Sequence, residues 1–149
     1  MNINHISLVD IVAVAFSVIA TVFSVITYQK SIIHDRKQAT LDAYNRLQKQ
    51  ALDHLNYYMP RQIAEIAEDP RSAEYKKVSS YIARIEHFCV GVNQEIYDFE
   101  TVYVLAKGYL DGAIKARIEP IINKKNQFGE MDYYENIHTI IQWMKQEES

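Results

Sequence analysis

The sequence contains few of the residues that define several protein classes. Its 149 residues include one cysteine, three prolines and four glycines. The lone cysteine, Cys89, cannot form an internal disulfide, which excludes a disulfide scaffold and agrees with a reducing compartment. The few glycines and prolines exclude a collagen-like chain, and the apolar content of 48% argues against a disordered one. Because the net charge is −3 and no long basic block occurs, nucleic acid is not an expected partner.

Charge is also missing from one segment near the N-terminus. Residues 11–29 carry no charged side chain and are mostly apolar. As a helix, this segment spans roughly 28 Å, close to the hydrocarbon thickness of a bilayer. It predicts a single transmembrane helix over residues 11–29, preceded by a short extracytoplasmic segment over residues 1–10. A secretory signal peptide fits less well, because the first ten residues contain no Lys or Arg. A buried core helix of this length would normally carry a charged face.

The charges beside this segment predict its orientation. No Lys or Arg precedes it, whereas five follow within about 20 residues of its end. These are Lys30, Arg36, Lys37, Arg46 and Lys49. Since the positive side stays in the cytoplasm, we expect a bacterial inner-membrane protein with its N-terminus outside and the rest of the chain in the cytoplasm. The lipid bilayer is its first expected partner.

Small residues recur along the apolar segment at alternating spacings of three and four. They form a narrow stripe, here called the seam: Ala13, Ser17, Ala20, Ser24 and Thr27. This period keeps one face towards a left-handed partner helix, and small side chains let two backbones approach closely. We therefore expect a homo-oligomer, with a small hydroxyl-lined pore as the extreme form. In the alternative, the anchor is monomeric and its hydroxyls bond to their own helix.

The rest of the chain shows helical periodicity and no strand-like alternation, which predicts an all-α fold. Residues 30–59 are expected to form a juxtamembrane stalk and a first cytosolic helix, and residues 60–149 a cytosolic bundle of about five helices. Pro60 should interrupt the helix. Asp69, followed by proline, and Asp98 should cap the next two helices. Pro120 should kink or break a later helix, and a last helix is expected over about residues 132–145.

Two pairs of carboxylates are the strongest enzymatic pattern. The pairs Glu65-x-x-Glu68 and Glu95-x-x-Asp98 could hold Mg²⁺ against phosphates, and they resemble the metal motif of the all-helical MazG-type nucleotide pyrophosphohydrolases. A membrane-anchored, Mg²⁺-dependent nucleotide hydrolase is therefore an alternative. Two observations argue against this alternative. Glu68 lies at the expected helix boundary next to Asp69, and the sequence has no Gly-rich phosphate loop, nucleophile elbow or zinc-protease motif. We predict no enzyme, no catalytic residue, no cofactor and no metal site.

Several polar side chains lie beside the apolar stripes of the expected helices. Arg84 and Glu86 could form a buried or intersubunit ion pair or lie in solvent. His87 and Cys89 diverge on one helix, so they do not form a metal site. Lysines near a helix end suit its dipole. The candidate polar or interface residues are Arg84, Glu86, His87, Asp98, Lys124 and Lys125.

Four short patterns carry a family resemblance: Ile85-Glu86-His87-Phe88 with Gly91-Val92, Ile96-Tyr97-Asp98, Ile118-x-x-Ile121 up to Lys125, and Arg36-x₃-Thr40-Leu41. With them, the chain resembles the bacterial family catalogued as domain of unknown function 4760. It departs from the family at Ile85, where an aromatic residue is more usual, and at Lys124 or Lys125 in place of an arginine. The resemblance implies a small, membrane-tethered helical protein of a bacterium or prophage and implies no activity.

Together these observations predict a single-pass inner-membrane protein with a cytosolic helical domain that binds a protein partner or a small-molecule signal. The layout suits a non-enzymatic, homo-oligomeric regulatory or phage-defence-type effector, in which changes in the bundle alter packing in the membrane.

Overall fold

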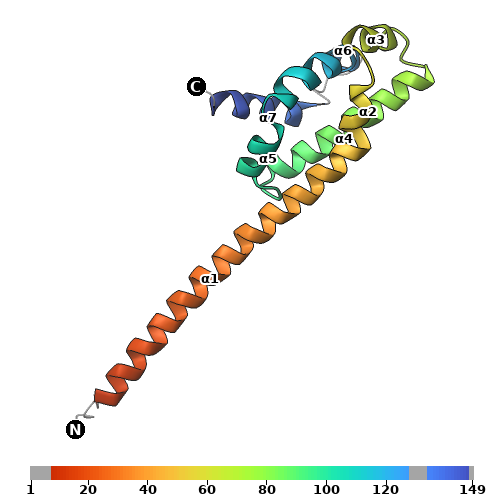
Figure 1. Ribbon diagram of the computed structural model, residues 1–149. Helices are drawn as coiled ribbons and strands as arrows, with labels where there is room; N and C mark the ends of the chain where they lie inside the picture. Colours follow the sequence, from red (N-terminus) through yellow and green to blue (C-terminus); the bar gives the residue numbers. More distant parts are fainter. Residues whose placement is uncertain (1–7, 128–133, 148–149) are drawn as a thin grey trace. The chain divides into compact units, whose positions relative to one another are not determined.

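The computed structural model describes residues 8–127 and 134–147 (Figure 1). Throughout these residues the regular structure is helical and contains no strand, which confirms the all-α prediction. The chain divides into two compact units, residues 1–35 and 36–149. Each unit is described by itself below.

The first unit contains most of helix α1 (Leu8–Leu47), which carries the apolar segment. Judged by length and composition, it is the one helix among the described residues that could cross a membrane. The Ser17 hydroxyl donates to the Ala13 carbonyl at 2.9 Å, and the Thr21 hydroxyl to the Ser17 carbonyl at 2.8 Å. From Val9 to Ile33, the large apolar side chains of this unit are exposed: Val9, Ile11, Val12, Val14, Phe16, Val18, Ile19, Val22, Phe23, Val25, Ile26, Tyr28, Ile32 and Ile33.

In the second unit, the end of α1 continues through a π-helical turn, η1 (Gln48–Leu52), into α2 (Asp53–Asn56). A helix over this region is predicted by its sequence, but the wide turn is not. A π-turn holds more residues than an α-turn. It therefore brings the adjacent Ala51 and Leu52 into the core together, and both are fully buried.

The helix is interrupted after Asn56, and Pro60 begins the next one, α3 (Pro60–Ala67), in agreement with the predicted interruption at Pro60. Proline lacks a backbone N–H, but at the first helical position this group has no partner within the helix, so its absence costs nothing. The Met59 amide just before it donates to the side-chain oxygen of Gln62 at 2.8 Å.

The predicted cap of the next helix is wrong by three positions. Helix α4 (Ala73–Asn93) is capped by Ser72, whose hydroxyl accepts from the Tyr75 amide at 3.1 Å. Asp69 instead accepts from the Arg71 amide at 3.1 Å. The local competition between two capping side chains is thus won by the one nearer the apolar stripe that begins at Tyr75.

Helix α4 ends in a Schellman turn that uses a residue other than glycine. The Glu95 amide donates to the Val92 carbonyl at 3.0 Å, and the Ile96 amide to the Gly91 carbonyl at 2.9 Å. Glu95 has a φ of 57°, in the left-handed region. Gly91 lies so close to the Tyr97 ring that a Cβ added at this position would come within 2.5 Å of Cε2 of that ring.

We therefore expect Glu95→Gly to raise the free energy of unfolding by about 1 kcal/mol, because glycine adopts this conformation without steric cost. Chemical denaturation of the full chain in detergent measures the change. Glu95→Ala is the matched control, since it removes the same charge but keeps a Cβ. An equal gain in both variants would assign the effect to charge and contradict the backbone explanation.

The next segments are α5 (Phe99–Ala106), a second π-helical segment η2 (Tyr109–Ile114), and α6 (Lys115–Asn126). The prediction that Asp98 caps α5 is confirmed. Pro120 does not break α6, which continues through it. Burial of Ile118, Ile121 and Ile122 explains this, because each buried side chain contributes about 1.5–3 kcal/mol against a cost of about 3 kcal/mol for an internal proline.

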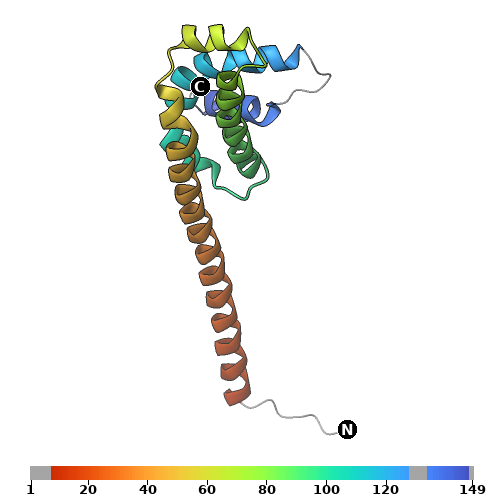
Figure 2. The same cartoon turned by 90° about the vertical axis from the view of Figure 1, so that its right-hand side faces the viewer.

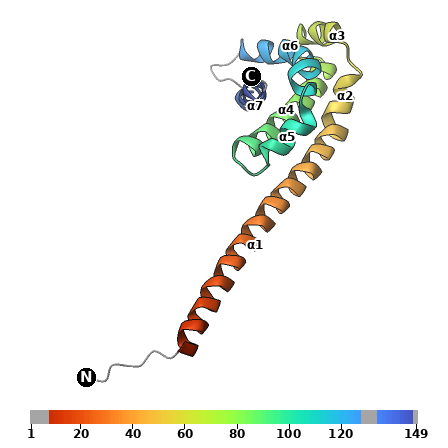
Figure 3. The same ribbon diagram turned by 60° about the vertical axis from the view of Figure 1, so that its left-hand side comes forward.

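The last helix, α7, spans Glu135–Gln146. Its predicted start at residues 132–133 lies outside the described residues. Helix α4 packs against α7, η1, α3 and α6 and forms the centre of the second unit. Figures 2 and 3 show α3 at one end of this unit and the turn between α4 and α5 at the opposite end. The core between them contains Val78, Ile82, Ile85, Cys89 and Val92 of α4.

Candidate functional site

The two carboxylate pairs of the hydrolase alternative belong to α3 and to the turn after α4, and Figure 3 shows these segments at opposite ends of the second unit. One pair belongs to α3 and its end, while the other follows α4, whose 21 residues separate them. A helix of this length spans about 30 Å, far beyond the reach of a shared ion. Within residues 8–127 and 134–147, no three His, Cys, Asp or Glu side chains are grouped so as to hold a metal ion. The structure does not favour this alternative.

Each of these acidic side chains has a local environment of its own. Glu65 pairs with Arg61 at 3.2 Å along α3, and Glu68 pairs with Lys124 at 3.5 Å. Glu95 occupies the turn after α4. Asp98 accepts from the Thr101 amide at 2.9 Å as the cap of α5. Three of the four therefore have structural partners that do not involve a metal.

Buried polar contacts join the end of α1 to the start of α5. Thr40, fully buried, donates its hydroxyl to the Arg36 carbonyl at 2.7 Å and accepts from the Asp98 amide at 2.8 Å. Burial acts to raise the pKa of Asp98. The hydrogen bonds from Thr101 and the charges of Lys37 and Arg36 outweigh it and lower that pKa below its usual value. Asp98 therefore stays charged and keeps its capping role at neutral pH.

An ion pair reinforces the same junction at the surface. Lys37 contacts Glu100 in the first turn of α5, with 3.0 Å between Nζ and Oε2. This hydrogen bond raises the pKa of Lys37, and the charges of Glu100 and Asp98 add to the effect. Glu100 is largely exposed, so the pair contributes little to stability compared with the buried Thr40 contact.

Glu86 lies between α4 and the start of α7. Its carboxylate accepts from the Asn136 side chain at 2.7 Å and from the amides of Asn136 and Ile137 at 3.2 and 3.0 Å. The Asn93 side chain donates to that of Asn136 at 2.9 Å. A carboxylate at a helix N-terminus satisfies unpaired amides and complements the helix dipole. Glu86 is thus a cap supplied by another helix, a contact that its local sequence does not predict.

The remaining candidate residues around α4 and α6 have structural contacts. Lys125 donates to the Tyr134 hydroxyl at 2.8 Å, and its ammonium lies 5.1 Å from that ring centre. Burial, with the charge of Glu86, raises the pKa of Tyr134 to about 12. Burial also raises the pKa of the Cys89 thiol, so this cysteine is an inert core residue.

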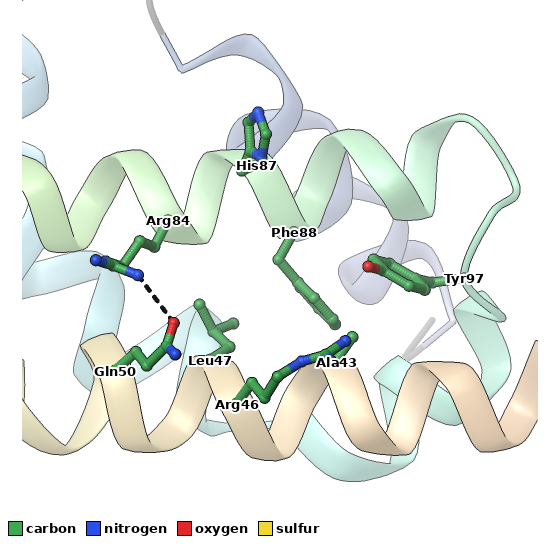
Figure 4. A pocket seen from close by; sticks show the side chains of 8 residues that line it. All are labelled: Ala43, Arg46, Leu47, Gln50, Arg84, His87, Phe88 and Tyr97. Carbon is green, nitrogen blue, oxygen red and sulfur yellow. Dashed lines mark hydrogen bonds between the residues drawn. The ribbon is translucent and has the colours of Figure 1, made fainter.

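Arg84 and His87 lie at a pocket between α4 and the end of α1 with η1 (Figure 4). The pocket has a volume of about 260 Å³ and lies entirely within the second unit. The Arg84 guanidinium donates to the side-chain oxygen of Gln50 at 2.8 Å. The residues that line the pocket are Ala43, Arg46, Leu47, Gln50, Arg84, His87, Phe88 and Tyr97.

One wall of this pocket is aromatic. The rings of Phe88 and Tyr97 stack with 5.3 Å between their centres, and Tyr44 supports Phe88 edge-on at 6.1 Å. Sequence reasoning singled out Arg84 and His87 but did not connect them with Gln50 or Tyr97. The missing signals are the π-helical turn that carries Gln50 and the turn after α4 that carries Tyr97.

A family model described as a domain of unknown function, DUF4760, matches residues 11–143. The chain belongs to this family. The match covers the apolar segment and nearly all of the second unit. Among the curated proteins and the solved structures, none matches the chain.

The structure brings together several DUF4760-like patterns of the sequence. Thr40 contacts the Asp98 amide, Gly91 lies against the Tyr97 ring, and Phe88 stacks on that ring. Three of the four patterns therefore meet where α1, α4 and α5 join, next to the pocket of Figure 4. The fourth pattern lies in α6, where it supplies the buried Ile118 and Ile121.

Proposed function

We propose that the protein is a single-pass inner-membrane protein with a helical regulatory domain in the cytoplasm. The observation that carries this proposal is the exposure of the large apolar side chains from Val9 to Ile33 in the first unit. Soluble proteins rarely expose a continuous apolar surface of this kind, and a bilayer would cover it. A backbone bonded internally as a helix suits that environment. The cytoplasmic orientation of the second unit rests on the basic residues after the apolar segment.

The regulatory role is supported by the continuity of α1. This single helix begins in the apolar segment and ends with Tyr44 and Leu47 buried in the second unit. A change in packing within the second unit therefore acts on the helix that also forms the anchor. No enzymatic step is part of the proposal. The second unit instead binds a protein partner or a small-molecule signal, as in a regulatory or phage-defence-type effector.

Two lysines placed in the apolar segment test the anchor. We expect Val18→Lys with Val22→Lys to move the full chain out of the carbonate-resistant membrane fraction of an expressing bacterium. Each lysine strongly opposes insertion at the centre of a membrane helix. The matched control, Val18→Ala with Val22→Ala, should remain in the membrane. A wild-type chain found in the soluble fraction, or a lysine variant retained in the membrane, would disprove the anchor.

Self-association along the seam is the second part of the proposal. The hydroxyl of Ser17 donates to the Ala13 carbonyl of its own helix, so it needs no acceptor on a partner helix, and its small side chain still allows close approach. We expect Ser17→Leu with Ser24→Leu to reduce the native mass of the full chain in nanodiscs to that of a monomer. Val18→Leu with Val25→Leu adds as many leucines away from the seam and should leave the mass unchanged. A monomeric wild-type chain would contradict self-association.

A further inference from the structure

The pocket between α4 and the end of α1 with η1 is positively charged. Two arginines and a histidine line it, and its lining includes no carboxylate. Across the described residues, neither Arg46 nor Arg84 has an acidic side chain within ion-pair distance. Arginines without acidic partners are ready donors for a phosphate or carboxylate, which they bind in a planar, two-pronged geometry.

One of these arginines is held in place by the protein. Gln50 accepts a hydrogen bond from Nη1 of Arg84, which fixes one side of the guanidinium and leaves its other N–H groups available. Gln50 belongs to the π-helical turn η1. Turns of this type occur mostly as single bulges within α-helices, frequently at functional sites. Figure 4 shows the pair at one end of the pocket.

The middle and the other end of the pocket are apolar and aromatic. Leu47 lies beside the Arg84–Gln50 pair, while Phe88, Tyr97 and the side chain of Arg46 lie towards the other end (Figure 4). The rings of Phe88 and Tyr97, which stack on each other, give this end of the pocket an apolar, aromatic lining. Ligand pockets commonly combine such apolar walls with a few polar groups that fix orientation.

From this combination we propose that the pocket binds a small, soluble organic anion. Its phosphate or carboxylate group is held by Arg84, and its apolar part lies against Leu47, Phe88 and Tyr97. Arg46, towards the other end of the pocket, adds positive charge that attracts the anion. The volume of about 260 Å³ is just below the usual range of about 300–1,000 Å³ for drug-sized ligands, which limits the ligand to a small molecule. This inference rests on the proposed function in one respect, that the second unit receives a soluble signal.

Three probes separate the parts of this recognition: phenyl phosphate, inorganic phosphate and phenol. The full chain is placed in nanodiscs of neutral lipid, so that no anionic headgroup competes, and binding is measured by titration calorimetry. We expect phenyl phosphate to bind most tightly, inorganic phosphate more weakly, and phenol not detectably. The affinity for phenyl phosphate should fall as salt is raised, because exposed charges are screened.

Variants of the two arginines locate the site. Arg84→Gln should weaken phenyl phosphate binding by about tenfold or more, the effect of losing a hydrogen bond to a charged group. Arg46→Gln removes only a nearby positive charge, so its effect should be smaller and should vanish at high salt. Arg84→Lys should recover only part of the affinity, since lysine keeps the charge without the planar fork. Arg61→Gln, on α3 and largely exposed, is the matched control and should bind like the wild type.

Equal binding by wild type and Arg84→Gln, equal affinity for phenol and phenyl phosphate, or no binding of phenyl phosphate at millimolar concentration would each overturn the proposal. None of these results bears on the anchor, because membrane fractionation of the same variants reports it separately. Unchanged helical content by circular dichroism shows that a variant with reduced affinity is still folded. Loss of binding in such a folded variant supports the site.

Discussion

Glu86→Ala is expected to lower the free energy of unfolding of the second unit by about 3 kcal/mol, the largest effect we predict for a single side chain. The carboxylate accepts from two backbone amides and one side-chain amide at the start of α7. Its removal leaves the first turn of that helix without an acceptor in a partly buried position. Hydrogen bonds to a charged group contribute about 1.5–3 kcal/mol each, and losses within one cluster are not additive.

The chain contains its own reporter for this change. Trp143, its one tryptophan, lies on α7 and meets the Phe99 ring edge-on, with 5.6 Å between the ring centres. Denaturant titration of the full chain in detergent, followed by tryptophan fluorescence, therefore measures the release of α7. If α7 separated from the rest in a step of its own, the fluorescence transition would precede the loss of helical circular dichroism.

Two control variants separate capping from general loss of charge. Glu86→Gln keeps the length of the side chain and one acceptor oxygen, so we expect a loss smaller than that of alanine. Glu119→Ala removes a carboxylate that pairs at the surface with Lys115 at 3.6 Å. Its expected effect is below about 0.5 kcal/mol, as for exposed ion pairs. A similar loss in Glu119→Ala and Glu86→Ala would contradict the capping role.

The contrast between predicted and observed features follows the range of the interactions involved. The all-α fold is predicted correctly, since apolar residues such as Ile82, Ile85, Ile118 and Ile122, which are buried, recur at helical spacing and periodicity is a local property. The helix interruption at Pro60 and the cap at Asp98 are also local and are predicted correctly. Ser72 and Asp69 compete within three positions, and the prediction of Asp69 is wrong because Ser72 lies nearer the buried stripe of α4.

Contacts between distant segments are not accessible to the same reasoning. Glu86 lies 50 positions from Asn136, and Thr40 lies 58 from Asp98. The sequence indicates that Glu86 is beside an apolar stripe but not which helix end it meets. The candidate pocket shows the same limit, because Arg84 is visible as a polar residue on α4 whereas its partner Gln50 depends on a π-helical turn. Periodicity at the α-helical spacing does not reveal such a turn.

The contacts around Thr40 explain how α1 is held in the second unit. Its apolar contacts there, through Ala43 and Leu47, are non-directional. Tyr44 adds a long hydrogen bond from its hydroxyl to the Leu105 carbonyl, at 3.3 Å. Thr40 adds a directional one, because its hydroxyl oxygen must meet the Asp98 amide. That amide belongs to the residue that caps α5, so one hydrogen bond fixes the position of α1 against the start of another helix. A rigid junction of this kind is what the proposed regulatory role requires of the anchor helix.

Thr40→Val should therefore lower the free energy of unfolding by about 2 kcal/mol, the cost of leaving a buried amide without an acceptor. Valine has nearly the same shape and is also β-branched, so neither a cavity nor a change in helix propensity accounts for the loss. Thr40→Ser keeps the hydroxyl and should retain most of the stability. The measurement is the same denaturant titration, with circular dichroism as the signal.

Thr139→Val is the matched control for the hydroxyl. Thr139 also lies in a helix, but its hydroxyl donates only within that helix, to the Glu135 carbonyl at 2.9 Å. Its removal should change the stability by less than about 0.5 kcal/mol, because that carbonyl keeps its place in the helix. If both valine variants lost the same stability, the effect would come from the bond within the helix. A loss confined to Thr40→Val assigns it to the contact with the Asp98 amide, and hence to the junction between α1 and α5.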